Sequence, residues 1–228
     1  PMGDFIITNN YQFDSIPDQQ MVIHAIDSRI WLMANEDKEL KQALLQSDIL
    51  VPNGAGITLA ARWLTGKQIH NVSRDDLHLS ILQHLDKVAG SVFYLRASDR
   101  TLALIAERIL TEYPNIRVKT YSPPYRDSFS EEETNKMITA INEFKPDVLF
   151  IGMSVSKQEK WIATNRHLLH THLISGIGAV FGFYGGTTSY PPQWRKQQSL
   201  SAIKILITTL QIKNRKKSLK TSTEYETN

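Results

Sequence analysis

Short apolar runs alternate along this chain with segments of helical periodicity, and this alternation limits the fold more than any other feature. The clearest run is Pro146–Met153 (PDVLFIGM), and similar runs occupy Asp48–Pro52 (DILVP) and Ser91–Leu95 (SVFYL). Each is followed by a polar or glycine-containing turn and then by apolar residues spaced three and four apart. Strands that alternate with helices in this way form parallel sheets. We therefore predict an α/β fold with a mostly parallel sheet flanked by helices.

The same patterns predict the remaining elements. Ser98 or Asp99 can cap one helix, and Ser130 followed by Glu133 forms a capping box for another. A further short apolar run, Arg29–Met33, is not assigned to either type of element. Strands are expected at 116–121 and 171–177. Helices are expected at 37–46, 57–64, 75–87, 100–113, from the capping box to 144, and at 159–168.

Several classes of active site are excluded by composition and motif. None of the 228 residues is a cysteine, so a disulfide framework, a thiolate zinc site and a cysteine nucleophile are absent. The seven histidines form no H-E-x-x-H motif, and the chain contains no Walker motif and no G-x-S-x-G elbow. Asp-x-Asp, the carboxylate pair of many metal-dependent sugar-nucleotide transferases, is also missing.

Three turns that follow predicted strands could hold a ligand. They are Val51–Gly56, Ser156–Trp161 and Gly176–Ala179. Ligands of parallel sheets bind at the carboxyl ends of the strands, where glycines allow close approach and helix N-termini attract anions. A phosphate or a sugar would suit such turns. The alternative is structural: a tight strand-to-helix turn, a solvated first helical turn, and aromatic residues after Gly178 that belong to the core.

The C-terminal part of the chain has a different character. The formal net charge is +3, yet residues 1–194 carry −3. Apolar residues at helical spacing run through 194–219, and no acid interrupts the basic ones, which predicts a basic amphipathic appendage at 193–220 after a domain at 3–192. Residues 221–228 form a polar end. The alternative is a terminal helix packed on the core. The basic residues are Arg195, Lys196, Lys204, Lys213, Arg215, Lys216, Lys217 and Lys220.

Together these segments resemble the WecG/TagA/CpsF family of bacterial glycosyltransferases over roughly residues 5–215. The strongest match is the apolar strand followed by Lys-Gln-Glu-Lys-Trp. The matching landmarks are Ala34-Asn35, Asp48–Gly56, Val72–Leu77, Lys145–Trp161, Asn165-Arg166 and Gly176–Gly186. The resemblance implies a Rossmann-like domain and an inverting, metal-independent transfer from a UDP-sugar to a polyprenyl-diphosphate-linked sugar, in surface polysaccharide or cell-wall synthesis.

The resemblance also implies partners and a location. It places the protein in the cytoplasm, peripherally on the inner face of the bacterial membrane, without a nucleic-acid partner, and it permits a homo-oligomer. The appendage would contact the anionic membrane surface and the acceptor diphosphate through Arg195, Lys204, Lys213, Arg215, Lys216 and Lys217. Basic residues near an anionic leaflet contribute about 1 kcal/mol each.

Site residues follow from the same resemblance. The expected substrate-binding residues are Asn35, Gly54, Gly56, Arg74, Gln158, Glu159, Lys160, Trp161, Gly176 and Gly178. The family's proposed general base is an aspartate, and that position is Asn53 here. An amide cannot accept a proton near neutral pH, so we expect Asp76, or Asp75, to act as the base.

Other family positions also differ. Met33 stands where the family has a threonine, Asn71 replaces an arginine whose role Arg74 could assume, and Arg96-Ala97-Ser98 replaces a glycine-rich turn. Three hypotheses remain open. The chain is a divergent active transferase, a catalytically impaired homologue that binds sugar nucleotide or lipid-linked sugar as a partner of another transferase, or an unrelated binding module whose basic end recognises another polyanion.

Overall fold

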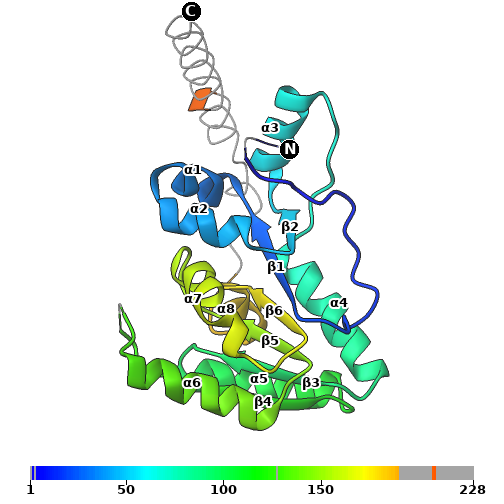
Figure 1. Ribbon diagram of the computed structural model, residues 1–228. Helices are drawn as coiled ribbons and strands as arrows, with labels where there is room; N and C mark the ends of the chain where they lie inside the picture. The colour runs from blue at the N-terminus through cyan, green and yellow to red at the C-terminus, as the bar shows by residue number, and fades with distance from the viewer. Residues whose placement is uncertain (1, 3, 127, 190–206, 209–228) are drawn as a thin grey trace, which may run out of the picture.

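The computed structural model describes residues 2, 4–126, 128–189 and 207–208, which form an α/β fold (Figure 1). The strands are β1 Met21–Ile26, β2 Ile49–Pro52, β3 Ser91–Leu95, β4 Arg117–Tyr121, β5 Val148–Ile151 and β6 Leu173–Gly176. The α-helices are α1 Ser28–Glu36, α2 Lys38–Leu45, α3 Ala55–Thr65, α4 Arg74–Lys87, α5 Asp99–Glu112, α6 Glu131–Phe144, α7 Lys157–Asn165 and α8 Val180–Tyr184.

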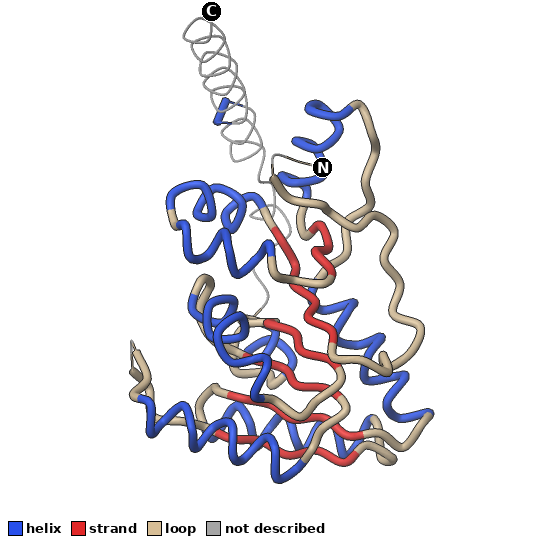
Figure 2. Tube along the Cα trace, in the orientation of Figure 1, coloured by secondary structure: helices blue, strands red, loops and turns tan. Residues whose placement is uncertain are grey.

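The six strands form one sheet in the order β2-β1-β6-β5-β3-β4, and every neighbouring pair is parallel. Figure 2 shows them as one twisted ladder with helices on both sides. The α/β prediction and the parallel sheet are confirmed. The predicted caps are also present: Ser98 accepts a hydrogen bond from the Thr101 amide, and Ser130 and Glu133 form the capping box of α6.

The strand β1 was missed by the sequence analysis. It pairs with β2 on one side and β6 on the other, so it is central to its half of the sheet. Its sequence, MVIHAI, contains His24, and this polar residue interrupts the apolar run. The run Arg29–Met33 lies in α1, whose N-cap is Asp27.

Side chains alternate between the two faces of the sheet, and each face has its own core. On one face, Tyr94 of β3 and Phe150 of β5 pack with residues of α4, α5 and α8. On the other face, Phe93 and Leu149 pack with residues of α6 and α7. A third cluster joins α1, α2 and α3 to the ends of β1 and β2.

This arrangement creates a crevice at the carboxyl edge of the sheet. The neighbouring strands β3 and β5 lead into α5 and α7, which cover opposite faces. The two connecting loops therefore diverge from one point, and in open parallel sheets such a point is where ligands bind.

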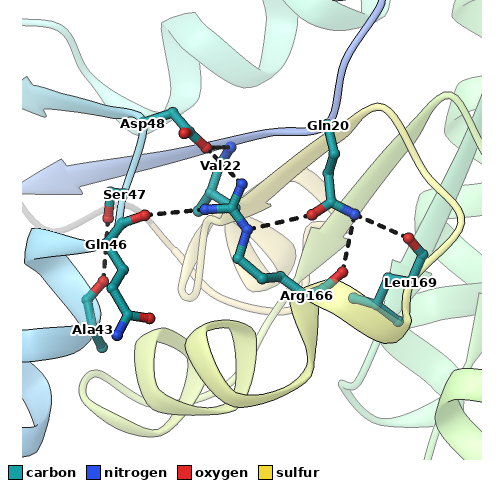
Figure 3. A network of polar contacts seen from close by, with 8 residues as sticks. All are labelled: Gln20, Val22, Ala43, Gln46, Ser47, Asp48, Arg166 and Leu169. Atoms are coloured by element: carbon teal, nitrogen blue, oxygen red, sulfur yellow. Dashed lines mark hydrogen bonds and ion pairs between the residues drawn. The ribbon is translucent and has the colours of Figure 1, made fainter.

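The opposite, amino edge of the sheet is held by Arg166 at the end of α7 (Figure 3). Its guanidinium donates from Nη2 to Asp48 Oδ2 at 2.8 Å, from Nη1 to the Gln46 carbonyl at 3.0 Å and from Nε to Gln20 Oε1 at 3.3 Å. The same Asp48 oxygen accepts from the Val22 amide at 2.7 Å. Arg166 thus fastens α7 to the starts of β1 and β2, far from the crevice.

The basic appendage and the polar end predicted for residues 193–228 lie outside the described residues, apart from residues 207–208. The domain boundary at 192 and the six basic residues assigned to membrane and acceptor contact therefore stay predictions. Within the described part of the chain, no helix is long and apolar enough to cross a membrane.

Candidate functional site

A cavity of about 770 Å³ lies at the crevice between the loops that follow β3, β4 and β5. Four consecutive residues come from the β3–α5 loop and the start of α5, four from the segment after β4, and three from the β5–α7 loop and the start of α7. Among the described residues it is lined by Arg96, Ala97, Ser98, Asp99, Ser122, Pro123, Pro124, Tyr125, Gly152, Ser154 and Lys157. None of the predicted substrate-binding residues is in this group, although Lys157 directly precedes Gln158.

Two cations converge on one wall of the cavity. Arg96 Nη2 and Lys157 Nζ both donate to the carbonyl oxygen of Arg126, at 3.3 and 3.0 Å. The Arg96 guanidinium carbon lies 5.0 Å from the ring centre of Tyr125 and 4.8 Å from that of Phe129. The two rings and the shared carbonyl orient the Arg96 side chain, which is 7% exposed. This wall is therefore a preformed positive surface.

Hydroxyl groups and a helix N-terminus complete the cavity. Ser98 caps α5, a helix of 14 residues, and Ser122 Oγ donates to the Ala97 carbonyl at 2.7 Å. A Cβ atom on Gly152 would lie 2.7 Å from the Arg96 carbonyl oxygen, so a glycine is needed where the two loops meet. Cations, hydroxyls and free helix amides are the groups that bind phosphate oxygens. The cavity therefore suits a phosphorylated ligand.

Four of the predicted site residues meet beside the cavity, between β6 and α7. Gln158 Nε2 donates to Glu159 Oε1 at 2.9 Å, and both side chains are about 1% exposed. The Ser156 amide donates to the other Glu159 oxygen at 2.7 Å. A Cβ on Gly176 would lie 2.8 Å from Gln158 Cδ, and one on Gly178 would lie 3.6 Å from Gln158 Oε1. Gly176 therefore makes room for the buried glutamine, whereas Gly178 is favoured by its backbone, with a φ of 52°.

His24 of β1 adds a buried titratable group near this cluster. Burial lowers the pKa of its imidazole, and the negative charge of Glu159 opposes that shift. The Nδ1 atom of His24 and the Oε1 atom of Gln158 are buried without a hydrogen-bond partner among the described residues.

Lys160 and Trp161, also predicted to bind substrate, make structural contacts. Lys160 Nζ lies 2.7 Å from Asp37 Oδ2 and 3.1 Å from Glu39 Oε2, which fastens α7 to α2. The hydrogen bond to Asp37 raises the pKa of Lys160. Trp161, a residue of α7, packs in the core between this helix and the sheet. Asn35 lies near the end of α1, where its side-chain amide donates to the Trp31 carbonyl at 2.7 Å.

The remaining predicted residues lie on the other side of β6, after β1 and β2. The backbone N–H of Asn53 donates to the Ile26 carbonyl at 2.9 Å, and the backbone N–H of Gly54 donates to the side chain of Asn71. Gly54 has a φ of 93°, which favours glycine, and it opens α3, in whose first turn Gly56 is buried.

Arg74, Asp76 and an aspartate that the sequence analysis missed lie near the same turn. Arg74 Nη2 donates to the Ala25 carbonyl at 3.0 Å and lies 3.6 Å from Asp27 Oδ2. Asp76, in the first turn of α4, is exposed. The missed residue is Asp27, because its place at the end of a strand is apparent only once β1 is known. The cavity residues were missed for a different reason, since they come from three separate loops.

Among the described residues, no three His, Asp or Glu side chains are grouped so that they could hold a metal ion. The expectation that no metal is needed stays a prediction.

The parallel sheet and its cationic cavity define an α/β protein whose cavity lies at the carboxyl edge, where open parallel sheets bind their ligands. A family model described as "Glycosyl transferase WecG/TagA/CpsF family" matches residues 10–203, so the chain belongs to this family. The family prediction is confirmed.

Curated relatives give the same result. The chain is 26% identical over 175 residues to the N-acetylglucosaminyldiphosphoundecaprenol N-acetyl-beta-D-mannosaminyltransferase of Bacillus subtilis strain 168, covering 76% of this chain and 66% of the relative. The proteins of the same name from Bacillus spizizenii strain W23 and Staphylococcus aureus strain NCTC 8325 are each 25% identical. Those matches cover 71% and 64% of this chain, and 61% and 56% of the relatives. The chain therefore spans less than two thirds of the length of these relatives.

Proposed function

We propose that the chain transfers a sugar from a UDP-sugar to a polyprenyl-diphosphate-linked sugar, with inversion at the anomeric carbon, during synthesis of a cell-wall or surface polymer. The observation that carries the proposal is the cavity, whose cations, hydroxyls and helix N-terminus suit a diphosphate. Membership of a glycosyltransferase family supports the reaction class. The names of the three relatives, which contain a diphosphoundecaprenol-linked sugar, support the acceptor class.

The cavity supplies what the leaving group of this reaction needs. As the bond to the anomeric carbon breaks, negative charge develops on the diphosphate oxygens. Arg96 and Lys157 would exchange their shared carbonyl for these oxygens and stabilise that charge in the transition state. This is the role expected of prepositioned cations in group transfer from phosphate leaving groups.

Donor binding is tested first by calorimetric titration of UDP. We expect Lys157→Met to weaken UDP binding about tenfold or more, because it removes one charge-assisted hydrogen bond. Lys136→Met is the matched control, since Lys136 is an exposed residue of α6 whose ammonium pairs with Glu132 at 2.7 Å. If the wild type and Lys157→Met bind UDP with equal affinity, the cavity is not the donor site.

Transfer itself is tested with a panel of UDP-sugars and short polyprenyl-diphosphate sugars, with product and released UDP measured together. The full chain should form product with at least one pair. Neither product nor UDP release across the panel would reject the proposed activity.

We further propose that the protein works at the inner face of the bacterial cell membrane, without spanning it. Support comes from the eight basic residues between Arg195 and Lys220, which no acid interrupts, and from the lipid-linked acceptor named for the relatives. Binding to vesicles should rise with the content of anionic lipid and fall with salt. Deletion of residues 193–228 should abolish it, and binding that survives the deletion would reject this role.

A second candidate function is a homologue without turnover that binds sugar nucleotide or lipid-linked sugar as a partner of another transferase. The amide of Asn53 at the turn after β2 favours it, because an amide does not accept a proton near neutral pH. A gain of transfer in Asn53→Asp, starting from an inactive wild type, would support this function. Transfer by the wild type would reject it.

A further inference from the structure

Transfer of a sugar to a hydroxyl needs a group that accepts the hydroxyl proton. Under the proposed function, on which this inference rests, a carboxylate at the edge of the sheet must do so. Asp99 lines the cavity and is exposed at the start of α5, and Asp76 is exposed in the first turn of α4. Asp27 differs from both because it is partly buried, with 16% of its side chain exposed, and because its carboxylate is held in place.

The backbone places Asp27 directly beside Asn53. In the parallel pair of β1 and β2, Ile26 is in register with Pro52, so the next residue of each strand comes to the same point of the edge. The hydrogen bond from the backbone N–H of Asn53 to the Ile26 carbonyl, 2.9 Å long, continues this pairing beyond the strands. Asp27 and Asn53 therefore occupy neighbouring positions of the edge, beside the turn that begins with Gly54.

Two contacts orient the Asp27 carboxylate. Its Oδ1 accepts a hydrogen bond from the Ile30 amide at 2.9 Å, which caps α1. Its Oδ2 lies 3.6 Å from Arg74 Nη2, and the same nitrogen donates to the Ala25 carbonyl at 3.0 Å. Among the described residues, no hydrogen-bond donor lies closer to Oδ2 than this guanidinium, so Oδ2 keeps lone pairs for an incoming hydroxyl. A base that is held by its surroundings before the substrate arrives loses little freedom in the reaction.

The distance along the edge fits the substrates. The cavity lies at the ends of β3 and β5, and only β6 separates β5 from β1. Lys157 follows β5 and Arg96 follows β3, so two to three strand spacings, about 10–14 Å, separate these residues from the end of β1. This span can hold a diphosphate at the two cations, the anomeric carbon bonded to it, and the acceptor hydroxyl between that carbon and Asp27, with the acceptor arriving from the side of β2.

We propose that Asp27 is the general base of the transfer reaction. The acceptor hydroxyl oxygen forms a bond to the anomeric carbon of the donor, and its proton passes to Asp27 Oδ2. The bond between the anomeric carbon and the diphosphate oxygen breaks, and its electron pair leaves with the nucleoside diphosphate. Asn53, one strand away, is then a hydrogen-bonding neighbour of the reacting hydroxyl, and Asp76 has no part in the proton transfer.

The test compares kcat, KM and UDP binding in Asp27→Asn, in Asp76→Asn and in the exchanged pair Asp27→Asn/Asn53→Asp. Asparagine caps helices as well as aspartate does, so Asp27→Asn keeps the start of α1, and a melting curve checks that it folds. We expect kcat to fall about a hundredfold or more with UDP affinity unchanged. The acid limb of the pH–kcat/KM profile should also be lost in Asp27→Asn. Asp18→Asn, an exposed residue before β1, is the control for surface charge.

The exchanged pair separates a base from a structural partner of Arg74. It returns a carboxylate to the same point of the edge, so its kcat should exceed that of Asp27→Asn by about tenfold or more. A kcat of Asp27→Asn within threefold of the wild type, a retained acid limb, or no recovery in the exchanged pair would each overturn the proposal. If the wild type itself neither binds UDP nor transfers sugar, the proposed function fails and this inference fails with it.

Discussion

His78 should make the stability of this protein depend strongly on pH between 7 and 5. The imidazole is 1% exposed, and its Nε2 lies 2.5 Å from the Tyr94 hydroxyl. Its ring centre lies 4.9 Å from that of Phe150 and 4.8 Å from that of Tyr184. Burial, followed by the charge of Arg108, lowers the pKa of His78 to about 3. The side chain is therefore neutral in the folded protein at any pH above this value.

The sign and size of the effect follow from linkage. The unfolded chain protonates the same imidazole below a pKa of about 6.5, so at lower pH the unfolded state binds the extra proton and is favoured. The contribution to stability is complete above pH 6.5 and is lost as the pH falls toward 3. With these two pKa values, the loss from pH 7 to pH 5 is about 2 kcal/mol.

The assay is urea unfolding at pH 7 and at pH 5 at constant ionic strength. His24 acts in the same direction, so the test is a difference between variants. In His78→Phe/Tyr94→Phe the titrating ring is gone, and the lost hydroxyl leaves space for the larger ring. Its loss of stability on acidification should be smaller than that of the wild type by about 2 kcal/mol.

Tyr94→Phe alone is the control, because it removes the hydrogen bond but keeps the buried imidazole. It should retain the pH dependence of the wild type. An equal loss on acidification in the wild type and the double variant, within about 0.5 kcal/mol, would refute burial of a neutral His78 as the cause.

Two further predictions concern packing and the amino edge of the sheet. Gly176→Ala should lower the free energy of unfolding by about 1–3 kcal/mol, because the new Cβ would lie 2.8 Å from Gln158 Cδ. Adding Gln158→Ala should recover part of this loss in a double-mutant cycle of urea unfolding, and strict additivity would contradict the clash. Arg166→Met should cost about 1–2 kcal/mol because it breaks the hydrogen bonds to Asp48, Gln46 and Gln20. A melting temperature equal to that of the wild type would show that the network is not stabilising.

Features that depend on neighbours in the sequence could be predicted from the sequence. The capping box of Ser130 and Glu133, the buried strand β5 and the turn at Gly54 all rest on local patterns of three to eight residues. The strand β1 could not, because the polar His24 interrupts its apolar run, and only tertiary packing shows that this imidazole is buried. With that strand missed, Asp27 had no visible relation to Asn53.

The contacts of the candidate site could not be predicted from local sequence patterns either. Gln158, Gly176 and Gly178 were predicted to bind substrate from two separate turns, and tertiary packing brings these two turns together. Their role in substrate binding stays a prediction. The lining of the cavity combines loops after three strands, and the partners of Arg96 lie about thirty positions away in the chain. No local pattern contains such information.

The backbone conformation of Arg96 supports a functional role for its side chain. Its φ of 69° lies in the left-handed region, which for a residue with a Cβ costs about 1–2 kcal/mol. A glycine would adopt the same conformation without that strain. Contacts with the Tyr125 and Phe129 rings offset the cost by about 0.5–1 kcal/mol each. The two rings and the hydrogen bond from Arg96 Nη2 to the Arg126 carbonyl thus hold a strained arginine at the wall of the cavity, which is the arrangement that the proposed diphosphate site requires.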